Sequence, residues 1–539
     1  MAHAVLLGDE AVALGAVHAG LTAAYAYPGT PATEIMEFLR GYSGRHLGKP
    51  RAAWTANEKT AFEGALGVCF VGRRALVSMK HVGLNVAADP FMNAARVAPH
   101  GGLVVAVADD PGMHSSQNEQ DSRFYADFAR IVCFEPADQQ EAYDMTREAF
   151  DVSERFRVPV LVRLVTRLAH ARSVVALREP RGENPLSKPP HAASWILLPS
   201  NARAQWRQLL DRQADIRRFS EESAWNRLTE GTGRTGVITT GIARNYFLEN
   251  MGDLPERPWH LHVGVHPAPV GLVRRLAEHV DRVLVLEDGY PFVERQLRGW
   301  LPSPLDVQGR ETGALPEDGE LTPDTVRRAL GLAPAVSVSV SPFPLPSRPP
   351  QLCQGCPHGD AYHALQRAVA GFGDAVVTSD IGCYTLGALP PYNAIESCVC
   401  MGASVGMAKG AADAGFRPAV AVIGDSTFLH SGVTPLMDAV AADADMTLVI
   451  LDNETVGMTG TQPTILPSSR LQSLVLGLGV DPAHFHVLDA HPRHTARNAE
   501  VLGREMAHKG LSVVILVREC IEAGKARRHA EQAEQGAPA

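Results

Sequence analysis

The sequence predicts a multidomain α/β protein in which parallel sheets are flanked by helices. With 539 residues, the chain is too long for a single hydrophobic core. Short apolar runs at 75–79, 102–108 and 158–165 alternate with helical segments such as 57–70. A Pro-rich segment at 337–351 separates two regions that show this alternation, as expected of a linker between domains.

Each region of the chain can be assigned an expected boundary. The boundaries are 1–175 for a first α/β region, 176–232 for a polar and partly helical connector, 233–336 for a smaller α/β region, 337–351 for the linker and 352–522 for a last α/β region. Later strands are expected at 236–241, 282–288, 375–380, 419–425, 447–453 and 512–517. The tail at 523–539 is rich in Ala, Gln and Glu and is expected to be frayed.

The composition excludes several classes of protein. The net charge of −9 is spread along the chain without a basic stripe, which argues against a nucleic-acid partner. No apolar run reaches membrane-spanning length, and Asp9 and Glu10 interrupt the apolar N-terminus, which does not resemble a signal peptide. Eight cysteines in so long a chain do not indicate a disulfide framework. A cytoplasmic protein without a membrane partner is expected.

Two polar segments follow apolar runs in the last third of the chain. Asp425 comes directly after the run 419–423, and Asn453 follows the run 448–451. A carboxylate and an amide at the ends of two buried strands form a hard-oxygen site suited to Mg²⁺ bridging a diphosphate. The pair therefore predicts the metal half of a thiamine diphosphate site.

A thiamine diphosphate site also needs a carboxylate against the aminopyrimidine ring, because the protein supplies the proton path for this cofactor. Glu58 is the candidate, since it lies at the start of the predicted helix 57–70, in a different region from Asp425. The competing interpretation is a helix-capping or helix-dipole role, which is usual for Glu near a helix N-terminus.

Four cysteines are spaced as ligands of one centre. Cys353 and Cys356 form a CxxC loop after the linker, Cys383 lies in a second loop, and Cys520 follows the last expected strand. Thiolates from separated loops at one end of a sheet can hold a [4Fe–4S] cluster. Zinc is the closest competitor, and unconnected thiols are the remaining alternative. Cys398 and Cys400 are interpreted as packing residues or alternative ligands.

Many segments resemble one family, indolepyruvate:ferredoxin oxidoreductase, in its large α subunit. Segments similar to its pyrimidine-binding domain are YPGTPATEI (27–35), NEKTAFEGALG (57–67), SMKHVGLNVAADP (78–90) and SSQNEQDSRFYA (115–126). Segments similar to its diphosphate-binding domain are CQGCPHGD (353–360), SDIGCYTLG (379–387), CMGASVGMAKG (400–410), GDSTFLHSG (424–432) and LDNETVGMTGTQP (451–463). VLVLEDGYPFVERQLRG (283–299) resembles its transketolase C-terminal-like domain.

The resemblance implies a role for individual residues. Glu58 would be the carboxylate that activates the cofactor, and Thr30 would hydrogen-bond the 2-oxoacid. Arg123 would clamp the substrate carboxylate, with a surface salt bridge as the alternative. The implied Mg²⁺ ligands are Asp425, Asn453 and the backbone carbonyl near Thr455, and the implied diphosphate contacts are Gly424, Ser426 and the turn Ile381-Gly382-Cys383. Lys80, His81 and His430 are further pocket candidates.

The implied activity is oxidative decarboxylation of arylpyruvates, such as indole-3-pyruvate or phenylpyruvate, to aryl-acetyl-CoA. Electrons would pass through the cluster to a low-potential acceptor such as ferredoxin. A smaller β subunit, resembling the family's γ-type domain, is expected as partner in a dimer of αβ units. No cysteine follows Cys520, whereas the family's α subunits end in a ferredoxin-like domain, so another acceptor stays open.

Two rival functions remain. The first is a non-oxidative thiamine-diphosphate-dependent decarboxylase or carboligase, which the four spaced cysteines argue against. The second is a non-catalytic scaffold with the same fold, which should lack at least one of Glu58, Asp425 and Asn453, yet all three are present.

Overall fold

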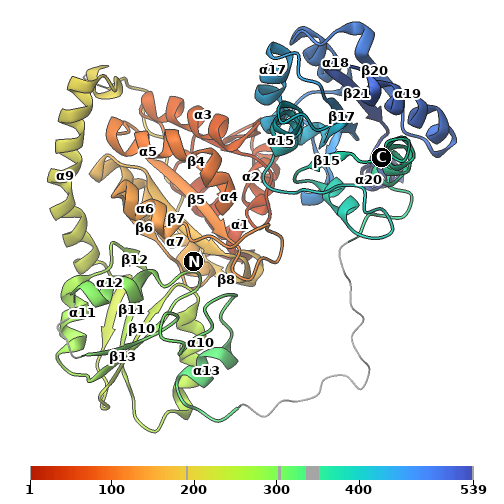
Figure 1. The fold of residues 1–539 in the computed structure, drawn as a ribbon. Helices are drawn as coiled ribbons and strands as arrows, with labels where there is room; N and C mark the ends of the chain where they lie inside the picture. The colour runs from red at the N-terminus through yellow and green to blue at the C-terminus, as the bar shows by residue number, and fades with distance from the viewer. Residues whose placement is uncertain (1, 190–191, 301–304, 335–350, 537–539) are drawn as a thin grey trace. The chain divides into compact units, whose positions relative to one another are not determined.

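The computed structural model describes residues 2–189, 192–300, 305–334 and 351–536. The chain forms two compact units, Met1–Val340 and Ser341–Ala539 (Figure 1). Nearly all of the expected Pro-rich linker lies outside the described residues. No helix among the described residues is both long and apolar enough to cross a membrane.

The first unit is built on a seven-stranded sheet. Its strands, in spatial order, are β12 (Val265–His266), β6 (Cys133–Phe134), β7 (Val160–Val165), β5 (Leu103–Asp109), β4 (Ala75–Lys80), β2 (Ala23–Ala26) and β3 (Arg51–Trp54). Neighbouring strands are parallel except β12, which is antiparallel to β6. The expected strands at 75–79, 102–108 and 158–165 correspond to β4, β5 and β7. Strand β5 is buried along its whole length, as its nearly continuous apolar sequence requires in a parallel sheet covered on both faces.

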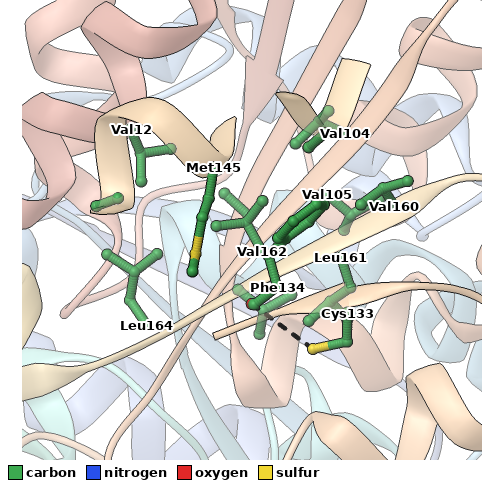
Figure 2. Close-up of a cluster of buried hydrophobic side chains, with 14 of the residues drawn as sticks. Val12, Val104, Val105, Cys133, Phe134, Met145, Val160, Leu161, Val162 and Leu164 are labelled. Carbon is green, nitrogen blue, oxygen red and sulfur yellow. Dashed lines mark hydrogen bonds between the residues drawn. The ribbon is translucent and has the colours of Figure 1, made fainter. Parts of the chain in front are cut away.

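Helices α1 (Gly8–His18) and α7 (Gln139–Phe156) pack against each other beside this sheet. Figure 2 shows part of the resulting core, where Val12 of α1 and Met145 of α7 lie near Val162 and Leu164 of β7. Asp138 caps the N-terminus of α7, because its side chain accepts a hydrogen bond from the backbone N–H of Glu141. The other helices of this region are α2 (Thr33–Arg45), α3 (Glu58–Phe70), α4 (His81–Val86), α5 (Ala88–Val97), α6 (Arg123–Ala129) and α8 (Thr166–His170).

A five-stranded sheet follows in the same unit. Its order is β14 (Asp306–Gln308), β13 (Arg282–Leu286), β10 (Thr235–Thr240), β11 (Trp259–Val263) and β9 (Asn226–Thr229), with only β9 antiparallel. Helix α9 (Pro199–Glu222) lies within the expected connector. Strand β12 comes from the later part of the chain but joins the seven-stranded sheet, so the two α/β regions share backbone hydrogen bonds. Strands β1 (His3–Leu7) and β8 (Arg172–Ala176) form a separate antiparallel pair.

The second unit contains an all-parallel five-stranded sheet. Its order is β15 (Val376–Ser379), β16 (Ala419–Gly424), β17 (Thr447–Asp452), β21 (Ser512–Val517) and β20 (Phe485–Asp489). Helices α14 (Pro357–Val369) and α19 (Thr495–Ala507) contribute to one apolar cluster, and α15 (Ala403–Asp413), α17 (Val433–Ala441) and α18 (Ser468–Gly477) to another. The two clusters cover opposite faces of the sheet, because alternate residues of its strands belong to each.

The expected frayed tail is helical instead. Helix α20 spans Ile521–Gly536, and residues 537–539 lie outside the described part. The segment forms a helix because it consists mainly of Ala, Glu, Gln, Lys and Arg, all of which favour the α-helix.

Candidate functional site

The ends of β16 and β17 bring the expected metal ligands together. The two strands are adjacent and parallel, with Gly424 paired to Leu451, so the residues that follow them meet at the same sheet edge. Asp425 begins the short helix α16 (Asp425–Thr427), and Asn453 directly follows β17. Asp425, Asn453 and Thr455 are all buried.

Backbone groups hold these side chains in place. The Asp425 carboxylate accepts hydrogen bonds from the N–H groups of Ser426 at 2.7 Å and Glu454 at 2.8 Å. Glu454 adopts a left-handed conformation with φ of 59°, and its N–H reaches the Asp425 carboxylate from the loop after β17. The Asn453 side-chain oxygen accepts from the N–H of Thr455 at 3.2 Å.

Asp452, which the sequence analysis did not single out, adds a second carboxylate. It ends β17 and is buried, and its Oδ2 has no hydrogen-bond partner. Burial raises the pKa of Asp425 well above its usual range, and the neighbouring Asp452 carboxylate raises it further. Two buried carboxylates beside an amide oxygen are a suitable ligand set for Mg²⁺, because a divalent cation would compensate both charges. The Asp-Asn doublet after an apolar run was the signal that could have found Asp452.

The loop after β15 lies against the loop after β16. The Thr427 hydroxyl donates to the carbonyl of Ile381 at 2.9 Å, which links the two loops. The ring of Tyr384 packs so closely that a Cβ at Gly382 or Gly424 would lie 2.3 Å or 2.6 Å from it. Both positions therefore require glycine. The Ser426 hydroxyl is buried without a hydrogen-bond partner, as a group that awaits an anionic ligand would be.

The four expected cysteines of the second unit converge. Cys353 and Cys356 form one turn, in which the N–H of Cys356 donates to the carbonyl of Cys353 at 3.0 Å. Cys383 and Cys520 both lie against Gly457, where a Cβ would be 3.3 Å from the first sulfur and 3.9 Å from the second. Burial, together with the other three thiols of the group, raises the pKa of the Cys383 thiol to about 12. Cys398 and Cys400 are exposed and are not among the groups that shift the pKa of Cys383.

Glu58 occupies a defined place in the first unit. It is the first residue of α3, directly after Asn57, whose side chain caps the helix by accepting from the N–H of Thr60. Its side chain is buried and points at α4. A Cβ on Gly83 of α4 would come within 2.5 Å of Glu58 Oε1, so the absence of a side chain at Gly83 makes room for the carboxylate.

Lys80 and Thr30 lie in the same part of this unit. The Lys80 ammonium donates to the carbonyl of Ser115 at 3.0 Å, and the Ser115 hydroxyl donates to the carbonyl of Thr30 at 3.2 Å. Burial lowers the pKa of Lys80 to about 8, although the charges of Asp110 and Glu58 oppose the shift. The neighbouring His81 is buried with neither ring nitrogen hydrogen-bonded, and burial lowers its pKa to about 4.

The expected role of Arg123 as a clamp for the substrate carboxylate is wrong, because its side chain is buried and fully hydrogen-bonded. Its side chain is 0% exposed. The guanidinium donates to the carboxylates of Asp121 and Glu287, the hydroxyl of Thr240 and the carbonyls of Asp288 and Tyr290. With these acceptors around it, the guanidinium offers no free edge to a ligand. Arg123 instead joins helix α6 to the ends of β10 and β13 in the five-stranded sheet.

Comparison with known proteins identifies the family. Residues 14–202 match the family model "Pyruvate flavodoxin/ferredoxin oxidoreductase, thiamine diP-bdg", and residues 380–515 match "Thiamine pyrophosphate enzyme, C-terminal TPP binding domain". The indolepyruvate oxidoreductase subunit IorA of Archaeoglobus fulgidus is 39% identical over 96% of this chain and 86% of its own length. The chain belongs to the IorA family. The IorA subunit of Methanothermobacter thermautotrophicus is 38% identical over 98% of this chain and 89% of its own length.

A solved structure agrees with this family at the level of the fold. It is a 2-oxoglutarate:ferredoxin oxidoreductase from Magnetococcus marinus, which aligns with a TM-score of 0.50 and 16% identity over 61% of this chain and 65% of that chain. The expected family, the thiamine-diphosphate-binding α/β fold and the enzyme class, a 2-oxoacid:ferredoxin oxidoreductase, are thereby confirmed.

Proposed function

We propose that this IorA-family chain is the catalytic α subunit of an enzyme that oxidatively decarboxylates arylpyruvates, such as indole-3-pyruvate or phenylpyruvate. The products would be aryl-acetyl-CoA, CO₂ and a reduced low-potential acceptor such as ferredoxin. Support for the substrate class comes from the IorA relatives, which are named as indolepyruvate oxidoreductases. A smaller β subunit would complete the enzyme in a dimer of αβ units. The free thiols of the present chain suit a cytoplasmic location.

Thiamine diphosphate, when bound, supplies the carbon nucleophile that makes decarboxylation of a 2-oxoacid possible. Asp425, Asn453 and the carbonyl of Thr455 would hold its Mg²⁺, and Asp452 would lie beside them. Gly424, Ser426 and the turn Ile381-Gly382-Cys383 would contact its diphosphate through backbone N–H and hydroxyl groups. The Ser426 hydroxyl, which has no hydrogen-bond partner, and the two neighbouring buried carboxylates of Asp425 and Asp452 support this assignment.

Glu58 would hydrogen-bond the aminopyrimidine ring and exchange a proton with it. Its buried position, its capped helix and the space at Gly83 support a carboxylate held in one orientation. Thr30 would hydrogen-bond the 2-oxoacid. Since the donors of Arg123 are engaged elsewhere, we assign the contact with the substrate carboxylate to Lys80, whose ammonium lies close to the Thr30 turn.

The observation that carries the oxidative reaction is the position of Cys383. It belongs both to the proposed diphosphate turn and to the group of four thiols, so a redox centre held by Cys353, Cys356, Cys383 and Cys520 would lie beside the cofactor. Zinc is the alternative for the same four thiolates. Iron and sulfide analysis of the purified chain distinguishes a zinc site from a [4Fe–4S] cluster.

The alternative is a non-oxidative thiamine-diphosphate-dependent 2-oxoacid decarboxylase. The two functions differ in products, so one experiment distinguishes them. The chain is copurified with its small subunit under anaerobic conditions and supplied with phenylpyruvate, coenzyme A and ferredoxin or a viologen dye. Formation of phenylacetyl-CoA with two electrons transferred per CO₂ supports the oxidative reaction. Release of phenylacetaldehyde with no acceptor reduction would establish the alternative.

A further inference from the structure

A second cluster of potential metal ligands lies in the first unit. Asp9 is in the first turn of α1, Glu34 is in the first turn of α2, and His170 is the last residue of α8. One ligand atom from each lies within 4.8 Å of the other two. Gly8 allows α1 to begin this close to α8, because a Cβ there would lie 2.2 Å from the carbonyl oxygen of Leu168.

Asp9 has a buried carboxylate that a bound cation would stabilise. Its side chain is 0% exposed, and no side chain donates a hydrogen bond to either carboxylate oxygen. Burial raises the pKa of Asp9 well above its usual range, the charges of Glu34 and Glu10 raise it further, and the backbone N–H of Ile35 opposes the shift. A buried carboxylate without compensation is unfavourable, and buried charges in proteins are normally paired or bound to metals.

Glu34 and His170 already have the spacing of ligands on one ion. Their Oε2 and Nε2 atoms are 3.4 Å apart. Ligand atoms bonded to a first-row metal at about 2.0–2.2 Å lie roughly 3.0–3.5 Å from one another. Both side chains are about one-third exposed, at 34% and 36%, so an ion could enter from solvent and keep bound water.

We propose that Asp9, Glu34 and His170 bind one divalent transition-metal ion of the Mn²⁺, Fe²⁺ or Zn²⁺ class. Two carboxylates and one imidazole suit these ions, whereas Mg²⁺ and Ca²⁺ prefer sites made only of oxygen ligands. The ion would balance the charges of both carboxylates and join α1, α2 and α8. Glu34 lies in the helix that follows the Thr30 turn, so the ion would also fix the start of that helix. This site is independent of the proposed reaction.

Mn²⁺ titration followed by electron paramagnetic resonance tests the site on the full chain. Bound Mn²⁺ is counted from the loss of the free-ion signal, with Mg²⁺ in excess to occupy the oxygen site at Asp425. Mn²⁺ binds thiolates poorly, so the cysteines do not contribute. The wild-type chain should bind one equivalent more than the Asp9→Asn and His170→Gln variants, and Mn²⁺ should raise the melting temperature of the wild type but of neither ligand variant.

Asp9→Asn keeps the shape of the side chain and removes the buried charge, so the metal-free variant should melt at or above the wild-type temperature. His170→Gln changes an exposed side chain and provides a second variant that should fold. Asp215→Asn, an exposed change on α9, is the matched control and should bind as the wild type does. Equal Mn²⁺ binding by the wild type and both ligand variants would overturn the proposal.

Discussion

The carboxylate of Glu58 lies directly against the backbone of Gly83, so close that a Cβ at Gly83 would come within 2.5 Å of Oε1. Gly83 lies inside α4, where alanine would ordinarily favour the helix. Gly83 is therefore expected to matter for the position of the Glu58 side chain and not for the stability of α4.

Gly83→Ala should reduce activity while the protein stays folded. The added methyl group must displace the Glu58 side chain, and a misplacement of about 1 Å can cost roughly 100-fold in rate. The measurement is kcat for 2-oxoacid-dependent acceptor reduction, together with the melting temperature. Gly67→Ala on α3 is the control, because no atom lies within 4 Å of a Cβ there, and it should retain full activity. An active Gly83→Ala enzyme would show that the position of Glu58 does not matter.

Lys80→Met should raise KM for the 2-oxoacid with a smaller effect on kcat. A hydrogen bond to a charged group contributes about 1.5–3 kcal/mol, which corresponds to about 10- to 100-fold in kcat/KM. Lys80→Arg should restore part of this loss because it keeps the charge. Lys59→Met, at an exposed position on α3, should have no effect. An unchanged KM in Lys80→Met would remove Lys80 from the substrate site.

The same lysine predicts a pH dependence. Burial lowers the pKa of Lys80 to about 8, so its ammonium is charged below that pH and neutral above it. The kcat/KM for the 2-oxoacid should therefore fall as the pH rises through about 8, and in Lys80→Arg this fall should disappear. Folding stability should change in the opposite direction, since the unfolded chain holds the proton more tightly and the cost of burying the charge is relieved above pH 8. A kcat/KM that is flat between pH 7 and pH 9 would contradict the assignment.

Mg²⁺ with thiamine diphosphate should raise the melting temperature of the second unit. Ligand at about 100 times its Kd stabilises the folded state by about 2.7 kcal/mol. Asp425→Asn should abolish this shift, while its ligand-free form should melt at or above the wild-type temperature because the repulsion from Asp452 is removed. Asp438→Asn, an exposed change on α17, should behave as the wild type. Retention of the shift in Asp425→Asn would place the Mg²⁺ elsewhere.

Anaerobically purified protein should contain about four iron and four sulfide ions per chain. Cys383→Ser should lose them, because Cys383 lies within the group of four thiols. Cys398→Ser is the matched control, since Cys398 is exposed and outside that group. Zinc at one equivalent with no iron would replace the proposed cluster by a structural metal site.

Local pattern was enough to predict much of the fold and the meeting of Asp425 and Asn453 at one sheet edge. Asp425 and Asn453 could be paired because adjacent parallel strands place their carboxyl ends at one edge. Cys353, Cys356, Cys383 and Cys520 could likewise be grouped from their positions in loops. Asp452 was missed because it ends an apolar strand, where its burial depends on the neighbouring strands rather than on its own segment.

Long-range contacts account for the errors. The resemblance and the bidentate fit of a guanidinium to a carboxylate suggest a substrate contact for Arg123, but no local signal marks its ion pair with Glu287, 164 residues away. Strand β12 could not be assigned to the first sheet for the same reason, since its partner β6 lies far earlier in the chain. The helical tail was a different error, in which a polar composition was interpreted as disorder although its residues favour helix.

The most direct test of the central claim compares CO₂ release from phenylpyruvate by the wild type and by Glu58→Gln, each saturated with Mg²⁺ and thiamine diphosphate. Glutamine fills the same space but cannot exchange the proton. A loss of roughly 10²- to 10⁴-fold in kcat, with cofactor binding retained, is predicted. A Glu58→Gln enzyme that releases CO₂ at the wild-type rate would contradict the assignment of Glu58 as the activating carboxylate.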